Sequence, residues 1–479
     1  MKKYLTSLLI LILPVQFTAQ QSDNSQSTSL AFMHVTVIDM TGAPPKPDMT
    51  VVISGNRITS LGRTGRVRIP RGARVIDATG KYLIPGLWDM HVHITETERS
   101  LPMFVANGVT GVRNTGGIAE RLFRWRAEVA SGRLLGPRIV ACGPVVDGEN
   151  PSHPDHSVIV RNAAEGKAAV ISLKRQGADF IKVYDGVPRD AYFAIAEESR
   201  RQHIPFVGHV PASVTTMEVS DAGQRSIEHL GTILEGSSTA ELELRNWVSP
   251  PAQAGDFSAI PRRIATRGSR MLDTYSDERA QELFRHLVRN HTWQVPTLLV
   301  KKIWAYVDDI STVEDARFRY VPRSVREEWS PQHQLLFRYR TPEFIAYNKR
   351  LFQKEMELVG AMRRAGVEFM TGTDVGGAYT YYGFSLHDEL ALFVETGFTP
   401  MEALQAATRN PARFLGQLNS QGTVERGKLA DLVLLEADPL ENIRNTRRIN
   451  AVVLGGRYLP KEALQGMLAD AEVAARRQG

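Results

Sequence analysis

The residues most able to do chemistry are two histidines that alternate within a short apolar run. His91 and His93 are separated by Val92 and follow the apolar segment 82–90. If this run is a β-strand, residues i and i+2 point to the same face, so one divalent cation can reach both imidazoles. The pair therefore predicts a metal site at the end of a strand.

Further metal-binding side chains follow in chain order, each at the end of a short β-like run. Neutral imidazoles with one carboxylate suit zinc or a neighbouring transition metal. Lys182 stands out because an ammonium would repel two cations. Its neutral amine can instead take up carbon dioxide and become a carbamate that bridges two metals, the alternative being a simple ion pair with a carboxylate such as Asp185. The predicted ligands of two divalent ions, with zinc as the expected metal, are His91, His93, carbamylated Lys182, His209, His229 and Asp374.

Such a pair of metal ions predicts hydrolysis. Two neighbouring ions can share a hydroxide, because each lowers the pKa of bound water toward about 7. Their excess positive charge stabilises the oxyanion formed when that hydroxide attacks a carbonyl. Asp374 is the predicted catalytic residue, which accepts the proton and delivers it to the leaving group. Tyr184, His153 and His156 are predicted to orient substrate, although a packed tyrosine and a polar surface loop remain the alternatives.

The elements that must position these residues alternate between strand-like and helix-like segments. Helical patterns at 191–202 and 400–408 fall between or after the strand-like runs, which favours a (β/α)₈ TIM-like barrel. An open doubly wound sheet is the competitor, but only a closed barrel brings the ends of strands one, four, five, six and eight around one point. The eight predicted strands are residues 87–94, 109–114, 138–142, 180–184, 205–210, 227–230, 294–299 and 368–373.

Short β-like segments also lie near both ends of the chain, which predicts a small β-sandwich domain formed by both terminal segments. Gly455 and Gly456 suit a tight hairpin turn between two of them. Residues 238–290 lack a clear strand and are interpreted as an inserted helical or loop region. The predicted organisation is a signal peptide at 1–19, a linker at 20–30, sandwich parts at 31–85 and 421–460, the hydrolase barrel at 86–420 and a C-terminal helix at 461–479.

Composition limits the function classes. The net charge of +6 is spread along the chain without a basic run interleaved with aromatics, so we expect no nucleic-acid partner. The N-terminal Lys2 and Lys3 followed by an apolar stretch predict a secretory leader and an exported, periplasmic or secreted protein. After its removal we expect no membrane span. The single cysteine, Cys142, excludes an internal disulfide. An oligomer is left open.

The motifs resemble those of the amidohydrolase superfamily, in particular its two-metal branch with a carbamylated lysine. The resemblance rests on the residues around His91 and His93, on Ile181-Lys182-Val183, His209 and His229, and on Gly372-Thr373-Asp374. It extends to segment 427–433, which looks like the family's return to the small β domain. The resemblance implies a metal-holding barrel and hydrolysis of amide, ester or related bonds. Within the family, the chain is similar to secreted Xaa-Pro dipeptidases and imidazolonepropionase-like members.

The sequence thus predicts a binuclear metal-dependent amidohydrolase. Its expected substrate is a small molecule with an amide or peptide-like bond, a dipeptide or an N-acyl amino acid, cleaved by the metal-bridging hydroxide. The same site would also suit a lactonase, a phosphotriesterase or a cyclic-amide hydrolase. A non-catalytic periplasmic binding protein is the rival from another class, and the full set of six candidate ligands argues against it.

Overall fold

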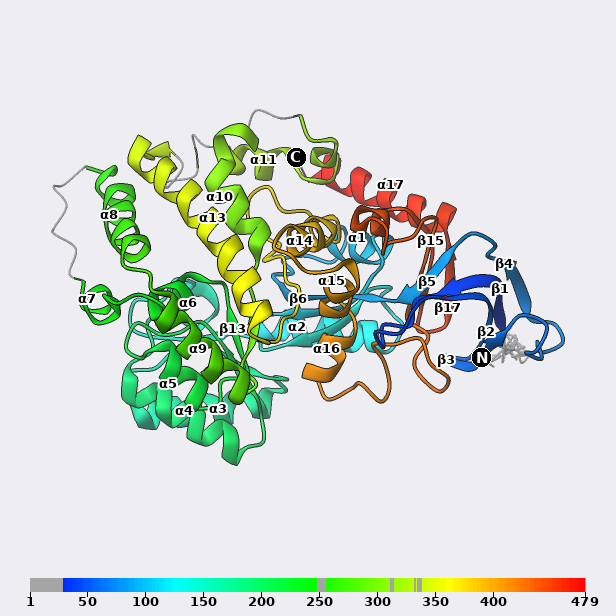
Figure 1. The fold of residues 1–479 in the computed structure, drawn as a ribbon, viewed down its shortest axis with the longest axis horizontal. Helices are drawn as coiled ribbons and strands as arrows, with labels where there is room; N and C mark the ends of the chain where they lie inside the picture. Colours follow the sequence, from blue (N-terminus) through cyan, green and yellow to red (C-terminus); the bar gives the residue numbers. More distant parts are fainter. Residues whose placement is uncertain (1–28, 248–255, 311–313, 331–332, 334–337, 479) are drawn as a thin grey trace, which may run out of the picture.

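The computed structural model describes residues 29–247, 256–310, 314–330, 333 and 338–478. The leader predicted at 1–19 lies outside the described residues, as does the linker prediction up to residue 28. The first strand begins at Leu30, so the predicted linker reaches one residue too far. Figure 1 shows a β-rich part at one end of the molecule, joined to a larger part in which helices surround parallel strands.

The β-rich part is one eight-stranded sheet to which both terminal segments contribute. Its order is β17-β16-β15-β5-β1-β2-β3, with β4 paired to β1. The N-terminal β5 pairs antiparallel with the C-terminal β15, placing Leu83 opposite Leu434. The strands are β1 Leu30–Val37, β2 Lys46–Ser54, β3 Arg57–Arg63, β4 Arg74–Asp77, β5 Tyr82–Pro85, β15 Leu432–Leu435, β16 Ile449–Leu454 and β17 Arg457–Pro460.

The local sequence explains how these strands turn and pack. Gly455 and Gly456 join β16 to β17 with φ values of 56° and 83°, which confirms the predicted hairpin, because this left-handed backbone is open to glycine. Alternate strand residues from both ends of the chain form one apolar cluster, including Phe32, Val51 and Leu432. The two terminal segments therefore stabilise each other across a shared core.

The larger part contains parallel strands in two ladders, which confirms an α/β fold. One ladder has the order β6-β7-β8 and the other β10-β9-β11-β12-β13-β14. Seven predicted strands are present: β7 has the predicted bounds, and the other six are shorter, with β13 and β14 beginning one residue earlier than predicted. The strands β9 and β10 are additional. The strands are β6 Leu87–Val92, β7 Val109–Asn114, β8 Arg138–Ala141, β9 Val145–Asp147, β10 Ser157–Ile159, β11 Ile181–Val183, β12 Phe206–Gly208, β13 Ser226–Glu228 and β14 Trp293–Val295.

The eighth predicted strand, residues 368–373, is an extended segment that forms isolated bridges rather than a regular ladder. On one side the Gln294 N–H donates to the Glu368 carbonyl at 2.9 Å, and on the other the Met90 N–H donates to the Thr371 carbonyl at 2.9 Å. A further parallel bridge joins Val92 to Val375. The segment consequently links β14, the last strand of one ladder, to β6, the first strand of the other.

Helices cover the outside of these strands. The predicted helices at 191–202 and 400–408 are present as α4 and α15, and residues 238–290 hold helices α7, α8 and α9. The helices of the first half are α1 Ser100–Ala106, α2 Ala119–Ala130, α3 Ala163–Gln176, α4 Arg189–Arg201, α5 Thr216–Asp221, α6 Gly231–Gly236, α7 Glu241–Arg245, α8 Ala259–Asp273 and α9 Asp277–Arg289. Those of the second half are α10 Leu298–Ile310, α11 Arg323–Trp329, α13 Pro342–Arg364, α14 Phe384–Glu395, α15 Pro400–Ala406, α16 Arg409–Phe414 and α17 Lys461–Arg477.

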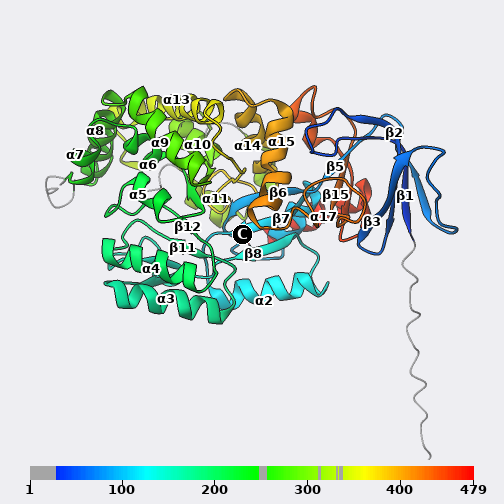
Figure 2. The ribbon, with the colours of Figure 1, turned by 60° about the horizontal axis from the view of Figure 1, so that its bottom comes forward.

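Local signals set several helix ends. Asn162 caps α3 by accepting the Glu165 N–H at 3.0 Å, and Gly177 ends that helix in the left-handed conformation. Thr399 and Glu402 form a capping box at the start of α15. Figure 2 shows α2, α3 and α4 lined up along one side of the parallel strands.

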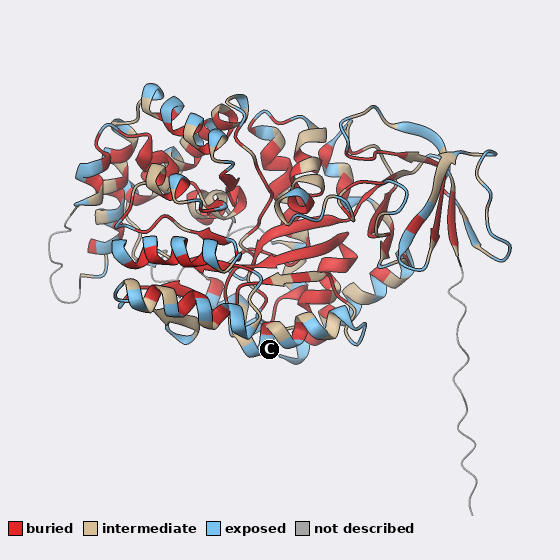
Figure 3. Cartoon of the chain, turned by 90° about the horizontal axis from the view of Figure 1, so that it is seen from below, coloured by how far each residue is buried: buried red, intermediate tan, exposed pale blue. Residues whose placement is uncertain are grey.

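Burial follows the layers. In Figure 3 the central strands are buried, whereas the outer faces of the surrounding helices are exposed. The main apolar cluster joins strand residues such as Val112 and Ile181 to helix residues such as Leu173 and Leu390. Polar side chains that are nevertheless buried at the strand ends are therefore exceptions that require partners. Among the described residues we find no helix with the length and apolarity needed to cross a bilayer.

Candidate metal centre

His91 in β6 and His93, directly after the end of that strand, face the carboxylate that follows the segment 368–373. His91 Nε2 lies 3.3 Å and His93 Nε2 lies 3.1 Å from the same oxygen, Asp374 Oδ1. The rings of His91 and His93 are 5.4 Å apart, so alternate strand positions do direct both imidazoles to one side. Burial alone would raise the pKa of Asp374, but charge and hydrogen bonds from the facing imidazoles, when these rings are protonated, hold it well below its ordinary value.

The other predicted ligands lie around the same point. The His229 ring is 5.0 Å from the His91 ring and 5.0 Å from the His209 ring. Among the described residues, ligand atoms of His91, His229 and Asp374 all lie within 4.8 Å of one another. All six predicted ligands line one cavity of about 450 Å³. The structure thus brings together residues that are far apart in the chain.

Lys182 lies in β11 with only 1% of its surface exposed. Its Nζ has no hydrogen-bond partner among the described residues. Burial lowers the pKa of the ammonium, because a charge is poorly solvated there. The alternative prediction of an ion pair with Asp185 is wrong, since Asp185 accepts a hydrogen bond from His209 Nδ1 at 3.0 Å instead.

Three of the imidazoles are oriented through their Nδ1 atoms. His91 Nδ1 donates to Glu228 Oε2 at 2.9 Å, His209 Nδ1 donates to Asp185, and His229 Nδ1 is hydrogen-bonded to Thr297 Oγ1 at 2.6 Å. Burial lowers the pKa of His209 and holds that of His229 well below its ordinary value. The rings of these two residues are therefore neutral, and a neutral ring bonded through Nδ1–H leaves a lone pair on Nε2.

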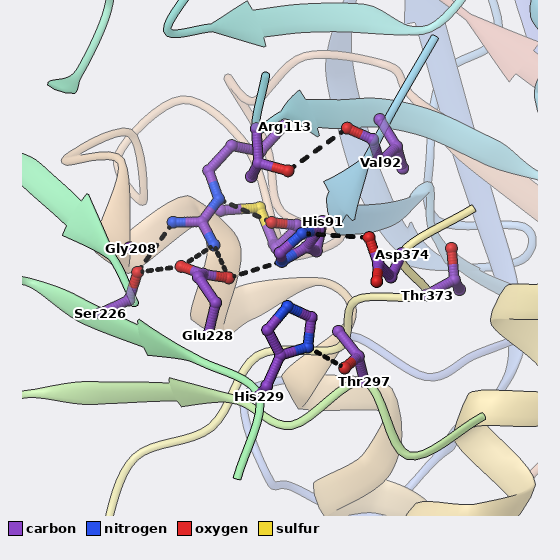
Figure 4. Close-up of polar contacts among 12 residues, drawn as sticks. His91, Val92, Arg113, Gly208, Ser226, Glu228, His229, Thr297, Thr373 and Asp374 are labelled. Atoms are coloured by element: carbon purple, nitrogen blue, oxygen red, sulfur yellow. Dashed lines mark hydrogen bonds and ion pairs between the residues drawn. The ribbon is translucent and has the colours of Figure 1, made fainter. Parts of the chain in front are cut away.

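A buried ion pair, Arg113 with Glu228, is hydrogen-bonded to His91 Nδ1, on the side of the ring away from Asp374 (Figure 4). Arg113 in β7 donates to both oxygens of Glu228, at 2.7 and 2.8 Å, and to the Met90 carbonyl at 2.6 Å. Arg113 and Glu228 are almost fully buried, so each compensates the charge of the other. Our sequence reasoning missed this pair. A charged residue inside the predicted strand 109–114 was the available signal, because a buried arginine needs a carboxylate.

Strand ends at the centre have unusual backbone geometry. His229, Thr297 and Asp374 all have positive φ values, 66°, 48° and 54°, which non-glycine residues rarely adopt. Asp89 holds the last of these segments by accepting the Thr373 N–H at 3.0 Å and the Thr373 hydroxyl at 2.6 Å. Strain of this kind persists only where surrounding contacts impose it, and it concentrates at functional sites.

The donor set fits divalent metal ions. With Nδ1 of His91 donating to Glu228, a neutral ring presents the Nε2 lone pair to the Asp374 carboxylate, and two acceptors 3.3 Å apart repel each other. A cation between them removes that repulsion. The buried Lys182 Nζ, which lacks a partner among the described residues, points to a further group in the same cavity. Nitrogen and carboxylate ligands are those of zinc and its neighbours.

The three predicted substrate residues also line this cavity. The Tyr184 ring lies 4.0 Å from the His209 ring, and its hydroxyl is hydrogen-bonded to His153 Nε2 at 3.1 Å. His153 and His156 are stacked with their rings 5.0 Å apart. Burial raises the pKa of Tyr184, so its hydroxyl keeps its proton at neutral pH and can donate a hydrogen bond to an oxygen atom in the cavity.

Comparison with known proteins agrees with this geometry. A model of the Amidohydrolase family matches residues 82–459. The chain is 25% identical over 401 residues to the ochratoxinase of Aspergillus niger, covering 77% of this chain and 73% of that protein. Its fold is similar to that of a Xaa-Pro dipeptidase with bound methionine in the active site, with a TM-score of 0.65, 21% identity and coverage of 90% and 100%. It is also similar to bottromycin amidohydrolase, with a TM-score of 0.70, 22% identity and coverage of 93% and 90%.

Proposed function

The chain belongs to the amidohydrolase family, and from that premise we propose that it is a metal-dependent hydrolase of a peptide-like bond in a dipeptide or an N-acyl amino acid. The observation that carries the proposal is the convergence of six candidate ligands on one cavity. A non-catalytic binding protein would not need a carboxylate within 3.3 Å of two imidazole nitrogens at the wall of a cavity for a small molecule.

The residues that would hold two metal ions, zinc in the first instance, are His91, His93, Lys182, His209, His229 and Asp374. For Lys182 we propose a carbamate, because an amine with a lowered pKa and no partner among the described residues is suited to take up carbon dioxide. Bound divalent ions would make water nucleophilic at neutral pH and polarise the substrate carbonyl. The chain's own residues supply orientation and proton transfer.

Asp374 is placed to move the proton. Its Oδ1 atom lies 3.1 Å from His93 Nε2 and 3.3 Å from His91 Nε2, and its carboxylate can accept a proton from the attacking water. In the hydrolysis the water oxygen bonds to the acyl carbon and the carbon–nitrogen bond breaks. The proton then passes from Asp374 to the departing nitrogen, which leaves as a neutral amine. Tyr184 would donate its hydroxyl hydrogen to the carbonyl oxygen, with His153 fixing that hydroxyl.

The substrate class is supported by the relatives. A Xaa-Pro dipeptidase, an ochratoxinase and a bottromycin amidohydrolase share the fold or the sequence pattern, and their names describe peptide or amide substrates or a specific toxin. The cavity of about 450 Å³ suits a small molecule of this kind. We therefore favour peptide-like amides as substrates over the lactones, phosphotriesters and cyclic amides that the same metal centre could hydrolyse.

We further propose that the parallel strands close into a barrel and that the terminal sheet is a β-sandwich. Backbone hydrogen bonds run from β14 through residues 368–375 to β6, and the Asp179 N–H donates to the Ala141 carbonyl at the end of β8. These contacts support closure of the parallel strands into a (β/α)₈ barrel over 86–420. In the terminal sheet, the Ile58 N–H of the edge strand β3 donates to the Lys428 carbonyl, close to β15. A sheet that curls back on itself around one core supports a sandwich built from 31–85 and 421–460.

Export is proposed from the N-terminal sequence alone. Lys2, Lys3 and the apolar stretch after them have the order of a cleavable leader. Expression of the full chain followed by N-terminal sequencing of the mature protein would test this. A periplasmic or secreted protein that begins near residue 20 is expected, and retention of residues 1–19 on a cytoplasmic protein would contradict it.

One experiment tests the hydrolase proposal. The purified protein is analysed for metal content and assayed on dipeptides ending in proline and N-acyl amino acids, with a lactone, a phosphotriester and a cyclic amide as comparators. We expect about two zinc-class ions per chain, amide hydrolysis that is lost on chelation and restored by zinc, and a mass increase from a carbamate on Lys182 in the native protein. Amide hydrolysis that survives complete metal removal would contradict the proposal.

A further inference from the structure

A second cavity, of about 360 Å³, adjoins the same centre. His229 and Asp374 line it as well as the first cavity, but its other walls are different. They come from α8, α10 and α13, and α10 and α13 pack side by side (Figure 1). A substrate whose scissile bond lies at Asp374 can therefore place one part in each cavity.

This second cavity is mostly apolar with one charged pair. Its aromatic wall includes Trp304, Phe344 and Phe352. The pair is Lys301 and Glu355, with Nζ and Oε1 separated by 3.6 Å. That distance is an ion-pair contact but is too long for a good hydrogen bond. Glu355 is fully buried, whereas the Lys301 side chain is 24% exposed.

The pair has unused hydrogen-bonding capacity. Neither carboxylate oxygen of Glu355 accepts a hydrogen bond from any described residue. Buried polar groups in folded proteins are normally paired, so an exception lining a cavity indicates a role in binding. Burial raises the pKa of Glu355, and the neighbouring Lys301 opposes that rise. At 3.6 Å from Oε1 the Lys301 Nζ makes no good hydrogen bond to Glu355, so its N–H groups can donate to a ligand in the cavity.

Lys301 is positioned by the same element that orients His229. Thr297, just before α10, is the hydrogen-bond partner of His229 Nδ1, and Lys301 follows four residues later. The first turn of α10 is held by the buried Glu389, which accepts the N–H groups of Leu298 at 2.9 Å and Leu299 at 2.7 Å. The backbone from which the Lys301 side chain extends is thus held by a helix anchored beside the centre rather than by a loop.

We propose that this second cavity binds the amino acid released by hydrolysis, with Lys301 pairing with its free carboxylate and the aromatic wall covering an apolar side chain. The inference rests on the proposed function. In a dipeptide or an N-acyl amino acid, the carboxylate is attached to the α-carbon that bears the scissile nitrogen, so a subsite for it must adjoin Asp374, as this cavity does. Lys301 is then a specificity residue and Glu355 a positioning residue.

The rival cation is Arg121 of α2, which lines the first cavity. Arg121 is exposed, and no described residue pairs with it. Water and salt screen an exposed charge, whereas an enclosed ammonium interacts more strongly with a carboxylate. Lys301, which is less exposed than Arg121, is consequently favoured, and Arg121 provides a matched control in which one cation is removed from the other cavity.

The test compares N-acetyl-L-phenylalanine with its C-terminal amide, following acetate release by the metal-loaded enzyme. We expect the acid to be preferred about 10- to 100-fold in kcat/KM, as for one charge-assisted hydrogen bond. Lys301→Met should remove that preference by raising KM for the acid, with the amide changed less than about twofold. Lys301→Arg should restore part of it, Glu355→Gln should weaken it, and Arg121→Met should leave it intact.

Calorimetric binding of L-phenylalanine and L-phenylalaninamide separates this inference from the proposed function, and thermal melting confirms that each variant is folded. If the wild type cleaves neither substrate but binds the acid better through Lys301, the subsite is supported and the hydrolase proposal fails. Equal binding of acid and amide by the wild type overturns the subsite. Loss of the preference in Arg121→Met but not in Lys301→Met also overturns it.

Discussion

Replacement of Glu228 by glutamine tests whether the buried charge behind His91 controls the metal centre. Glu228→Gln keeps the shape of the side chain but removes the negative charge shared by Arg113 and His91. In the wild type, Arg113 and His91 share the two carboxylate oxygens of Glu228. In the variant, both donors must share the single amide oxygen of glutamine. Because the pair is buried, the solvent cannot compensate for the lost charge.

The expected magnitudes follow from the contacts that remain. Breaking a buried ion pair costs about 3–5 kcal/mol, but Arg113 also donates to the Met90 carbonyl at 2.6 Å and to Ser226 Oγ at 2.9 Å. We therefore expect the free energy of unfolding to fall by about 3 kcal/mol, at the lower end of that range. Loss of the partner that orients a metal-binding histidine should weaken metal affinity about 10- to 100-fold.

Urea unfolding measures the first effect, and competition with a chromophoric zinc chelator measures the second. Glu198→Gln is the matched control, because Glu198 also pairs with an arginine, at 2.6 Å from Arg201 Nη2, but does not line either cavity at the centre. The control should keep the metal affinity of the wild type. The reasoning would be refuted if Glu228→Gln bound zinc as tightly as the wild type, or if the two variants lost affinity equally.

Three further predictions concern the proton carrier, the metal and a buried histidine. Asp374→Asn should lower kcat at least about 100-fold, as for loss of general acid–base catalysis, while elemental analysis still finds bound metal; near-normal turnover would disprove the proton-transfer role. Removal of metal by a chelator should lower the melting temperature and abolish hydrolysis, with both restored by zinc, because a ligand bound only by the folded state stabilises it; an unchanged melting temperature would contradict this. Burial, assisted by Arg447, lowers the pKa of His387 to about 4, so between about pH 6.5 and 4 the unfolded chain binds a proton that the folded chain does not. The free energy of unfolding should then fall by about 1.4 kcal/mol per pH unit from this residue as the pH decreases. His387→Gln should show a flatter profile in urea unfolding at pH 7 and pH 4.5, and parallel profiles would exclude the contribution.

The residues of the centre could be predicted because their signals are local. His91 lies in β6 and His93 directly follows its end, so the strand period of two, continued by one residue, places both on one side without knowledge of the rest of the fold. This alternation is visible in a few consecutive residues. The glycine directly before His209 is explained only by the fold, because Gly208 has a φ of 137° and a Cβ there would lie 2.2 Å from the Val183 carbonyl oxygen.

The partners of these residues could not be predicted because they are distant in the chain. Arg113 and Glu228 lie 115 positions apart, and Lys301 and Glu355 lie on two different helices. In both pairs, the residues next to the cation in the sequence do not indicate which carboxylate compensates its charge. Lys182 illustrates the consequence, since Asp185 is its near neighbour in sequence but hydrogen-bonds to His209.

The same contacts explain why the eighth strand is irregular. Residues 368–375 must bond to β14 on one side and to β6 on the other, and Gly372 approaches His91 so closely that a Cβ would lie 2.7 Å from the His91 Cβ. A regular ladder would hold Asp374 in the extended conformation, whereas its φ of 54° turns the carboxylate toward the imidazoles. The irregularity is therefore a requirement of the site.

Folding and metal binding should be coupled in this molecule. The fold brings the Nε2 atoms of His91 and His93 within 3.3 Å of one carboxylate oxygen and places the His229 ring beside them. Assembling acceptors so closely opposes folding unless a cation or a proton lies between them. The Nδ1 partners Glu228 and Thr297 fix the rings in this arrangement, so the chain cannot relieve the repulsion by turning them away. Binding of a divalent ion then contributes directly to the stability of the folded state.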